Sequence, residues 1–502
     1  MKSQGSNRAV RRPGRPGVLG LHSRRAEFGD WQTPSALAAD VLRVVQRRSP
    51  SPATVLEPTC GHGTFLDAAR STFPLAHLVG FDVSEEYVAR ARESLLGTNA
   101  RLEVADFFQL NWEDIVRQLP EPLLIIGNPP WVTNSTLGKI AATNLPPKAN
   151  FKGHSGLDAM TGKSNFDISE WMLLRLLLAA QGRSFFLAML CKSTVARRLM
   201  SHSASKCWRV NGAVYAIDAK THFAAAVDAV LLTVEPESEG RRRNRSVRWA
   251  VFSELGAQAP VRWMGVVDGK TCSDIERCEV TRDLEGTSEV EWRSGMKHDC
   301  SRVMELAVVG DAFINGSGEQ VHLEPEFVYP LLKGSDVANG RMRSDRRVIV
   351  PQRILGEDTS VIRLRAPDTW RYLCTNKEHL DARKSTIYRG QPSFAIFGVG
   401  DYSFAPYKVA ICGLYKRLVF ALVEPIDGRP VMLDDTSYFL PCETREEAAA
   451  LAKVLNSARA REFFEARVFW DAKRPVSKAL LQSLSLVALQ GLRPAVLPVR
   501  TR

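Results

Sequence analysis

Short apolar runs alternate with helical patterns along the first half of the chain. Runs rich in Val, Ile, Leu and Phe predict buried strands, and the stretches between them place apolar residues at helical spacing. Because helices separate successive strands, the pattern predicts an α/β fold whose sheet carries helices on both faces. The seven predicted strands cover residues 54–57, 77–83, 101–105, 123–126, 183–190, 213–217 and 230–234.

A glycine-containing turn follows the first predicted strand. The strand ends in Glu57, and the turn contains Cys60, Gly61 and Gly63 before a helix begins. Glycines in a strand–turn–helix unit let a nucleotide approach the backbone closely. A pair of glycines is weak support by itself, so this interpretation depends on the residues that end the neighbouring strands.

Acidic residues end the second and third predicted strands. Asp82 ends the second, where a carboxylate would accept the two ribose hydroxyls of a bound nucleoside. Asp106 and Phe107 end the third, where they would bind and flank an adenine ring. The carboxyl ends of the strands form the ligand-binding edge of an open α/β sheet. The alternative, in which the acids only cap separate helices, leaves the polar end of the fourth strand unexplained.

The fourth predicted strand runs into Asn128-Pro129-Pro130-Trp131. Two consecutive prolines restrict φ and lack N–H donors, so the backbone is stiff and its carbonyls have set directions. An Asn carbonyl beside a backbone carbonyl forms an acceptor pair for an NH2 group, and Trp131 offers a flat face to a planar ring. This arrangement suits a flipped-out nucleobase whose exocyclic amine reacts. The alternative is an ordinary Asn-Pro-Pro turn with a half-buried Trp.

The rest of the chain divides into an arm, two domains and a tail. Residues 1–26 are basic and contain no acid, so a disordered arm is expected. Residues 27–245 carry the strand pattern described above and end in an Arg-rich break. Residues 246–490 alternate short strands with turns and a few helices, one of them expected at 303–308, which predicts a mixed α+β second domain. Residues 491–502 form the tail.

Composition adds a class of partner and a compartment. Among the 502 residues, 67 Lys and Arg against 55 Asp and Glu give a net charge of +12, which favours a polyanionic partner, nucleic acid first. No apolar run is long enough to span a membrane, and the N-terminus lacks the apolar segment of a secretory signal. The nine cysteines contain no Cys-x-x-Cys pair, so neither a zinc module nor a disulfide framework is indicated. We expect an intracellular protein with no membrane partner.

Together these residues resemble the motifs of S-adenosylmethionine-dependent DNA amino-methyltransferases. The resemblance covers roughly residues 27–235 and rests on the turn at 57–65, the acids that end the next two strands, and the Asn-Pro-Pro-Trp sequence. The motif order, with a target-recognition domain last, is that of the γ group. The resemblance implies a Rossmann-like seven-stranded methyltransferase sheet followed by a C-terminal mixed α+β target-recognition domain.

The resemblance also implies roles for individual residues. Asn128 and the Pro129 carbonyl would hold the target amine, Trp131 would stack on the flipped base, and Phe223 would pack on the other face of that base. Trp at this place is more often seen after Ser-Pro-Pro in cytosine-N4 enzymes, whereas Asn favours adenine. Among the cofactor residues, Thr33 and Glu57 would contact the methionine end of S-adenosyl-L-methionine. The full implied cofactor set is Thr33, Glu57, Cys60, Gly61, Gly63, Asp82, Asp106 and Phe107; the full implied catalytic set is Asn128, Pro129, Pro130, Trp131 and Phe223.

The implied function is site-specific adenine-N6 methylation of double-stranded DNA as the modification enzyme of a restriction–modification or related defence system. A separately encoded restriction endonuclease or defence subunits would then be protein partners, and the compartment would be the bacterial or archaeal cytoplasm, at the nucleoid. No metal is expected, because the sulfonium of the cofactor is itself electrophilic. Two alternatives stay open: an RNA or protein-glutamine amine methyltransferase, and a catalytically weak DNA-binding subunit of a defence complex.

Overall fold

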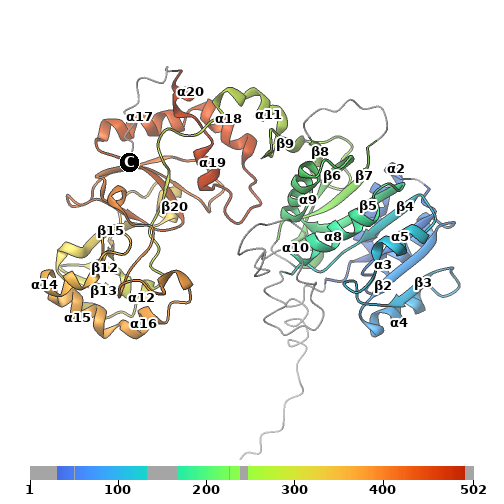
Figure 1. The fold of residues 1–502 in the computed structure, drawn as a ribbon, viewed down its shortest axis with the longest axis horizontal. Helices are drawn as coiled ribbons and strands as arrows, with labels where there is room; N and C mark the ends of the chain where they lie inside the picture. Colours follow the sequence, from blue (N-terminus) through green and yellow to red (C-terminus); the bar gives the residue numbers. More distant parts are fainter. Residues whose placement is uncertain (1–30, 50, 133–166, 225–226, 238–246, 492–502) are drawn as a thin grey trace, which may run out of the picture. The chain divides into compact units, whose positions relative to one another are not determined.

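The computed structural model describes residues 31–49, 51–132, 167–224, 227–237 and 247–491. The expected arm at 1–26, and all of the expected tail except Gly491, lie outside these residues. The chain divides into two compact units, Met1–Thr271 and Cys272–Arg502 (Figure 1). No helix in the described ranges is both long enough and apolar enough to cross a lipid bilayer.

A ten-stranded sheet forms the centre of the first unit, in the order β10-β9-β8-β6-β7-β5-β4-β1-β2-β3. The strands from β5 to β3 pair in parallel, whereas β7 is antiparallel to both β5 and β6. The seven strands expected from the sequence are β1 to β7, which lie side by side, and β8 to β10 extend the sheet beyond them. The bounds are β1 Thr54–Glu57, β2 His77–Asp82, β3 Arg101–Val104, β4 Leu123–Gly127, β5 Phe185–Lys192, β6 Val210–Ile217, β7 Ala229–Pro236, β8 Val247–Phe252, β9 Arg262–Val267 and β10 Lys270–Cys272.

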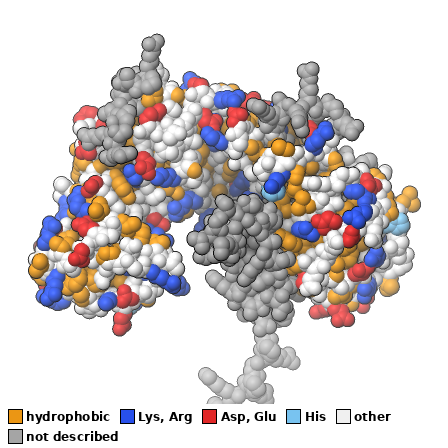
Figure 2. Space-filling view, in the orientation of Figure 1, with side chains coloured by type: hydrophobic (Ala, Val, Ile, Leu, Met, Phe, Trp, Pro, Cys, Tyr) orange, Lys and Arg blue, Asp and Glu red, His pale blue; other side chains and the backbone are white. Residues whose placement is uncertain are grey.

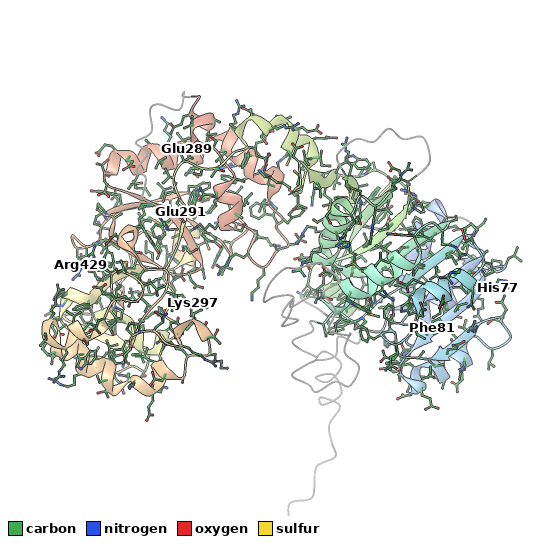
Figure 3. The ribbon with its side chains drawn as sticks, viewed as in Figure 1. His77, Phe81, Glu289, Glu291, Lys297 and Arg429 are labelled. Atoms are coloured by element: carbon green, nitrogen blue, oxygen red, sulfur yellow. The ribbon has the colours of Figure 1, made fainter. Side chains whose placement is uncertain are left out.

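Helices cover both faces of this sheet (Figure 1). Apolar residues of α2, α3 and α4 pack with alternate strand residues in one core. On the other face α5 packs on α8, and Trp112 of α5 contacts Phe81 of β2 with 5.6 Å between ring centroids. Figure 3 shows His77 at the start of β2 and Phe81 next to its carboxyl end. The helices are α2 Ser35–Arg48, α3 Thr64–Thr72, α4 Glu85–Ser94, α5 Trp112–Gln118, α8 Ile168–Ala179, α9 Ser193–Ser205 and α10 Ala219–Phe223.

The boundary between the two units lies later in the chain than the sequence indicated. Strand β8 pairs in parallel with β6, and β9 pairs with β8, so residues 247–267 continue the first sheet. The register sets the fully buried Trp249 opposite Gly212. A Cβ on Gly212 would lie only 2.3 Å from the indole ring, so the glycine makes room for this Trp. The expected boundary after residue 245 is therefore wrong, and the first unit extends to Thr271.

The second unit contains two smaller sheets and is a mixed α+β domain. The four-stranded sheet has the order β11-β20-β17-β18, and α17 packs against β17, β18 and β20. The six-stranded sheet has the order β14-β13-β12-β16-β15-β19 and shares a core with α14 and α15. The strands are β11 Arg293–Ser294, β12 Glu305–Val309, β13 Ala312–Asn315, β14 Gln320–Val321, β15 Val328–Leu332, β16 Arg346–Ile349, β17 Tyr407–Cys412, β18 Ala421–Val423, β19 Met432–Leu433 and β20 Ser437–Cys442.

Most helices of the second unit are short. The helix expected at 303–308 is wrong: α12 ends at Met304, and residues 305–309 form β12, because they pair with both β13 and β16. The α-helices are α11 Ile275–Val280, α12 Ser301–Met304, α13 Gly334–Ala338, α14 Ile362–Arg365, α15 Pro367–Thr375, α16 Lys377–Asp381, α17 Arg445–Leu455, α18 Ala458–Arg467, α19 Lys478–Gln482 and α20 Leu486–Gln490. The 3-10 helices are η1 Arg282–Leu284, η2 Pro325–Phe327, η3 Thr359–Val361, η4 Thr386–Tyr388 and η5 Asp401–Phe404.

Candidate active site

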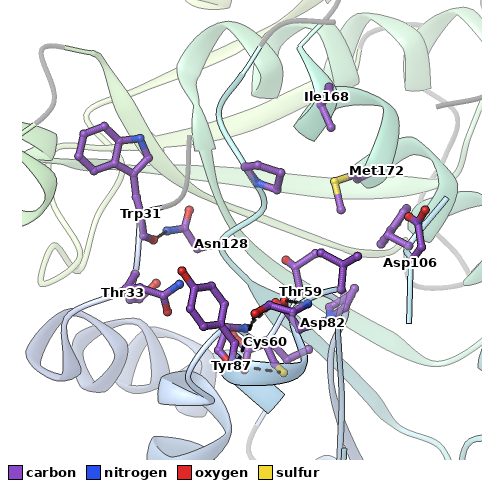
Figure 4. A pocket seen from close by; sticks show the side chains of 18 of the residues that line it. Trp31, Thr33, Thr59, Cys60, Asp82, Tyr87, Asp106, Asn128, Ile168 and Met172 are labelled. Atoms are coloured by element: carbon purple, nitrogen blue, oxygen red, sulfur yellow. Dashed lines mark hydrogen bonds between the residues drawn. The ribbon is translucent and has the colours of Figure 1, made fainter. Parts of the chain in front are cut away.

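A cavity of about 280 Å³ lies where the carboxyl ends of β1 to β4 meet. Segments far apart in the sequence line it, because parallel strands place their carboxyl ends at one edge of the sheet. Figure 4 shows residues from several of these segments, among them Thr33, Asp82, Asp106 and Asn128. The expected site residues that line the cavity are Thr33, Glu57, Cys60, Gly61, Asp82, Asp106, Phe107, Asn128 and Pro130.

The carboxylate of Asp82 accepts one hydrogen bond from the turn after β1 and one from the turn after its own strand, β2. The Gly61 N–H donates to Asp82 Oδ2 at 2.9 Å, and the Ser84 N–H donates to Asp82 Oδ1 at 2.9 Å. Gly61 and Gly63 have φ of +50° and +78°, a left-handed backbone that residues with a Cβ rarely adopt. Gly63 does not line the cavity; it precedes α3, and its N–H donates to the Cys60 carbonyl at 2.7 Å.

Glu57 is a buried carboxylate beside a second carboxylate. Its residue is only 3% exposed. Desolvation, and after it the nearby Asp82, raise the pKa of Glu57 well above its ordinary value, and the Leu66 backbone N–H opposes them. Burial also raises the pKa of Cys60, so this thiol is protonated and a poor nucleophile. A cation placed in this cavity would favour the ionised form of both acids, because it offsets the repulsion between them.

Three polar atoms of the cavity residues are buried without a hydrogen-bond partner among the described residues: Glu57 Oε2, Thr59 Oγ1 and Asn128 Oδ1. Buried polar groups are seldom left unpaired, since each missing partner costs roughly 1–3 kcal/mol. Such atoms fit a ligand that brings its own N–H or O–H donors. In the same described ranges, no group of three or more His, Cys, Asp or Glu side chains could hold a metal ion.

The segment that precedes α2 fixes the orientation of the Asn128 amide. Asn128 Nδ2 donates to the Trp31 carbonyl at 2.8 Å (Figure 4). The adjacent Gln32 accepts from the His62 N–H at 3.2 Å through its Oε1 atom, which ties the same segment to the glycine turn. Because the NH2 end of Asn128 is already engaged, its Oδ1 is the end left to accept a hydrogen bond.

Phe107 and Asp106 occupy the wall formed after β3. Asp106 Oδ1 accepts from the Phe108 N–H at 3.0 Å. Phe107 is 5% exposed, and its ring lies 4.6 Å from that of Trp112 and 6.1 Å from that of Trp171. Both residues line the cavity. The wall is therefore rigid, with an aromatic edge next to a carboxylate.

Trp131 and Phe223 meet, but outside the lining of this cavity. Their rings pack edge to face, with 5.2 Å between centroids and 73° between planes. They are 6% and 5% exposed and belong to the same apolar core as α2. Pro129 is also buried and does not line the cavity. The two rings that the sequence assigns to the faces of a base therefore contact each other and the same core in this structure.

Sequence reasoning missed several lining residues. Tyr87 lies on α4, where its ring packs edge to face against His62 at 4.8 Å between centroids. Ile168 and Met172 lie on α8 and close another side of the cavity (Figure 4). Tyr87 follows Asp82 by five residues, and this short spacing could have indicated that Tyr87 lies near the cavity. An apolar helix residue, in contrast, gives no local sign that it faces a cavity and not the core.

Comparisons with known proteins agree with this geometry. A family model described as a methyltransferase domain matches residues 55–116. The type II methyltransferase M.NspV of Nostoc sp. (strain ATCC 29411 / PCC 7524) is 42% identical over 481 residues, which are 94% of this chain and 99% of the relative. The chain belongs to the type II methyltransferases. It is a transferase of the restriction–modification class, and S-adenosyl-L-methionine is its cofactor.

Two further matches are more limited. The type II methyltransferase M.CvrRI of Paramecium bursaria Chlorella virus XZ-6E is 31% identical over 112 residues, 22% of this chain and 27% of the relative. The solved structure of the type IIL restriction-modification enzyme MmeI matches with a TM-score of 0.54 at 13% identity. This match covers 92% of our type II methyltransferase and 66% of the MmeI chain. It confirms the fold expected from the sequence: a Rossmann-like methyltransferase sheet followed by a C-terminal domain.

The residues of the cavity fit S-adenosyl-L-methionine. Its ammonium and sulfonium are cations, which suits a cavity that contains Glu57 and Asp82. Its ribose hydroxyls and amino groups are hydrogen-bond donors, which suits the unpaired Glu57 Oε2 and Thr59 Oγ1. The glycine turn leaves the backbone open to a ligand, and Phe107 offers an apolar surface to the adenine ring.

Proposed function

We propose that this type II methyltransferase methylates N6 of an adenine in double-stranded DNA, with the motif order of the γ group. The observation that supports this most is Asn128. Its Oδ1 is buried without a partner in the described residues, and its Nδ2 is bound to Trp31, so it presents an acceptor at the edge of the cofactor cavity. An adenine N6 amine offers the two hydrogens that Asn128 Oδ1 and the Pro129 carbonyl can accept.

The chain contributes position and electrostatics to the reaction. The N6 lone pair of adenine is delocalised into the ring and is a poor nucleophile. Two acceptors on the N6 hydrogens favour a pyramidal nitrogen and localise the lone pair, and the stiff Pro129-Pro130 backbone keeps them in place. When bound, S-adenosyl-L-methionine would supply an electrophilic sulfonium methyl to this lone pair, with the carbon–sulfur bond broken and the N6 proton released to water.

The proposed contacts of individual residues with the cofactor are those that the family resemblance implies, and most of these residues line the cavity. Glu57 and Thr33 face the methionine end, Asp82 accepts the ribose hydroxyls, and Asp106 with Phe107 contacts the adenine. Cys60 and Gly61 supply the backbone of the turn. Gly63 contributes through the shape of that turn, since it precedes α3 without lining the cavity.

Trp131 and Phe223 are proposed to hold the two faces of the flipped adenine. Their rings now contact each other at 5.2 Å between centroids. A base can enter between them only if this contact opens, and the base then replaces one aromatic contact with two. Such stacking is worth ~1–3 kcal/mol per base, which offsets part of the cost of unstacking the base from the duplex.

The second unit is proposed to be the target-recognition domain, because recognition domains follow the catalytic motifs in the γ group. Duplex DNA suits the net charge of +12. Lys and Arg side chains are spread over both units on the face shown in Figure 2. A restriction endonuclease or defence subunits encoded separately would complete the system.

Expression in a bacterial host that lacks adenine methylation tests the proposal. Sequencing that detects modified bases should find N6-methyladenine at one short motif, and the Asn128→Ala variant should leave the DNA unmodified. N4-methylcytosine instead would overturn the adenine assignment and make Trp131 the better guide to the base. Absence of any modified base would contradict DNA methylation, and assays on RNA and protein would then decide between the remaining methyltransferase substrates.

A further inference from the structure

The two prolines of the Asn-Pro-Pro-Trp segment cannot donate backbone hydrogen bonds. Pro129 and Pro130 have no N–H, so this part of the backbone has only carbonyls with which to bind its surroundings. Besides the bond from Asn128 Nδ2 to the Trp31 carbonyl, the contacts that hold this backbone must therefore be donors to its carbonyls. The structure supplies two such donors just after the prolines: Lys192 Nζ donates to the Trp131 carbonyl at 2.8 Å, and the Ile168 N–H donates to the Val132 carbonyl at 2.9 Å.

Lys192 reaches this carbonyl from the neighbouring strand. It is the last residue of β5, which pairs in parallel with β4, the strand that ends just before Asn128. Its ammonium also binds Asp167 Oδ2 at 2.6 Å. The side chain of Asp167 is 8% exposed and that of Lys192 is 22% exposed, so little water competes for this ion pair.

Asp167 is itself fixed by the start of α8. Its Oδ1 accepts from the Ser169 hydroxyl at 2.6 Å and from the Ser169 N–H at 3.2 Å, and it is the N-cap of this helix. Helix α8 supplies Ile168 and Met172 to the cofactor cavity. The pair of Asp167 and Lys192 therefore connects a wall of the cofactor cavity to the backbone that carries the amine acceptors.

We propose that Lys192, held by Asp167, is a positioning residue for methyl transfer. It does not line the cofactor cavity; it sets the place of the Trp131 carbonyl and, through the stiff prolines, of the Pro129 carbonyl and Asn128. Hydrogen bonds from charged donors are roughly twice as strong as neutral ones. A displacement of about 1 Å in a reacting geometry can lower the rate by about 10²-fold. The inference rests on the proposed function, because it needs Asn128 and Pro129 to be the groups that hold the amine.

The test compares Lys192→Met with a matched control. Arg198 of α9 binds Glu170 of α8 through Nη1 and Oε2 at 2.9 Å, and Glu170 is only 2% exposed, so Arg198→Met breaks a similar bridge between elements without touching the motif. Single-turnover rates are measured with DNA from a methylation-deficient host and labelled S-adenosyl-L-methionine, and the cofactor Kd is measured by calorimetry. Lys192→Met should lower the rate by about 10- to 100-fold, with the Kd changed by less than about threefold (~0.7 kcal/mol).

Lys192→Arg separates positioning from general stability. Arg keeps the charge and the donors, so it should recover most of the rate that Lys192→Met loses, whereas Arg198→Met should keep nearly the wild-type rate at temperatures where it is folded. Equal rates for Lys192→Met and Arg198→Met, or no recovery in Lys192→Arg, would overturn the proposal. Should Lys192→Met not fold, the double variant Lys192→Met/Asp167→Asn replaces it, because it removes the donor without leaving the charge of Asp167 unpaired, and a wild-type rate in that variant overturns the proposal equally.

The same experiment keeps the two proposals apart. Mass analysis of the wild-type product identifies the methylated base, and this result decides the adenine assignment. The ratio of variant to wild-type rate decides the role of Lys192, whichever base the wild-type enzyme methylates. A wild-type enzyme that transfers no methyl group to DNA would contradict both.

Discussion

Replacing Asn128 with Ala removes one acceptor from the proposed amine site and one structural hydrogen bond. The acceptor is Oδ1, which has no partner in the described residues, so its loss leaves no protein group unpaired there. The structural bond is the one from Nδ2 to the Trp31 carbonyl at 2.8 Å. The substitution therefore acts on folding through a single hydrogen bond and on catalysis through a different atom.

The two effects have different expected sizes. Loss of one partly buried hydrogen bond should lower the free energy of unfolding by about 1 kcal/mol. Removal of one preorganised hydrogen-bonding group from a reaction centre typically lowers kcat by about 10²–10³-fold, or ~3–4 kcal/mol in the transition state. Affinity for S-adenosyl-L-methionine should fall by less than about tenfold (~1.4 kcal/mol), because Glu57, Asp82 and Asp106 remain.

Asn111→Ala is the matched control. Asn111 is the N-cap of α5, where its Oδ1 accepts from the Asp114 N–H at 3.4 Å, and it does not line the cavity. Its loss should also lower the free energy of unfolding by about 1 kcal/mol and should leave kcat unchanged. Methyl transfer from labelled cofactor to DNA, calorimetric cofactor binding and urea unfolding are measured on both variants. A kcat for Asn128→Ala within about tenfold of wild type (~1.4 kcal/mol) would refute the acceptor role.

Three further substitutions probe other parts of the chain. Glu57 has a raised pKa, so calorimetry should show cofactor affinity falling as the pH drops through that pKa and Glu57 becomes neutral. Glu57→Gln should lack this pH dependence and should bind more weakly than wild type above that pKa, and an unchanged pH profile would count against cofactor contact. Burial lowers the pKa of Lys408 from 10.5 to about 7. Between these pH values the unfolded chain holds a proton that the folded chain lacks, so the free energy of unfolding should increase as the pH is raised from about 7 to 10.5. Urea unfolding of Lys408→Met should show no such increase with pH. An equal dependence of the free energy of unfolding on pH in the variant and the wild type would refute the prediction. Gly212→Ala forces a methyl against Trp249 and should cost about 1–3 kcal/mol of stability; a melting temperature equal to that of wild type would contradict the close packing seen at this pair.

The local pattern of the sequence determined the strand ends and the groups they carry. Glu57, Asp82, Asp106 and Asn128 each follow a short apolar run, and parallel strands bring such residues to one edge. Local pattern therefore sufficed to predict that these four residues share a cavity. Their individual roles toward cofactor and base stay predictions until the variants above are measured.

Only the tertiary structure decided features that depend on residues distant in the chain. Strand β12 was expected to be helical, and it is extended because β13 and β16 pair with it on both sides. The first unit extends past residue 245 because Trp249 packs over Gly212. The local sequence around either residue does not indicate this contact. Only the fold shows that the rings of Trp131 and Phe223 contact each other within one apolar core, and their role toward a base stays a prediction.

The hydrogen bond from Lys192 to the Trp131 carbonyl shows most clearly why the sequence does not reveal such contacts. A proline pair reveals in the sequence that donors are missing, but not which side chain will supply them. Lys192 does so because β5 lies beside β4 and Asp167 lies at the start of α8, and both facts come from long-range pairing. Periodicity encodes which face of an element is buried; which groups meet across elements is settled only when the elements pack.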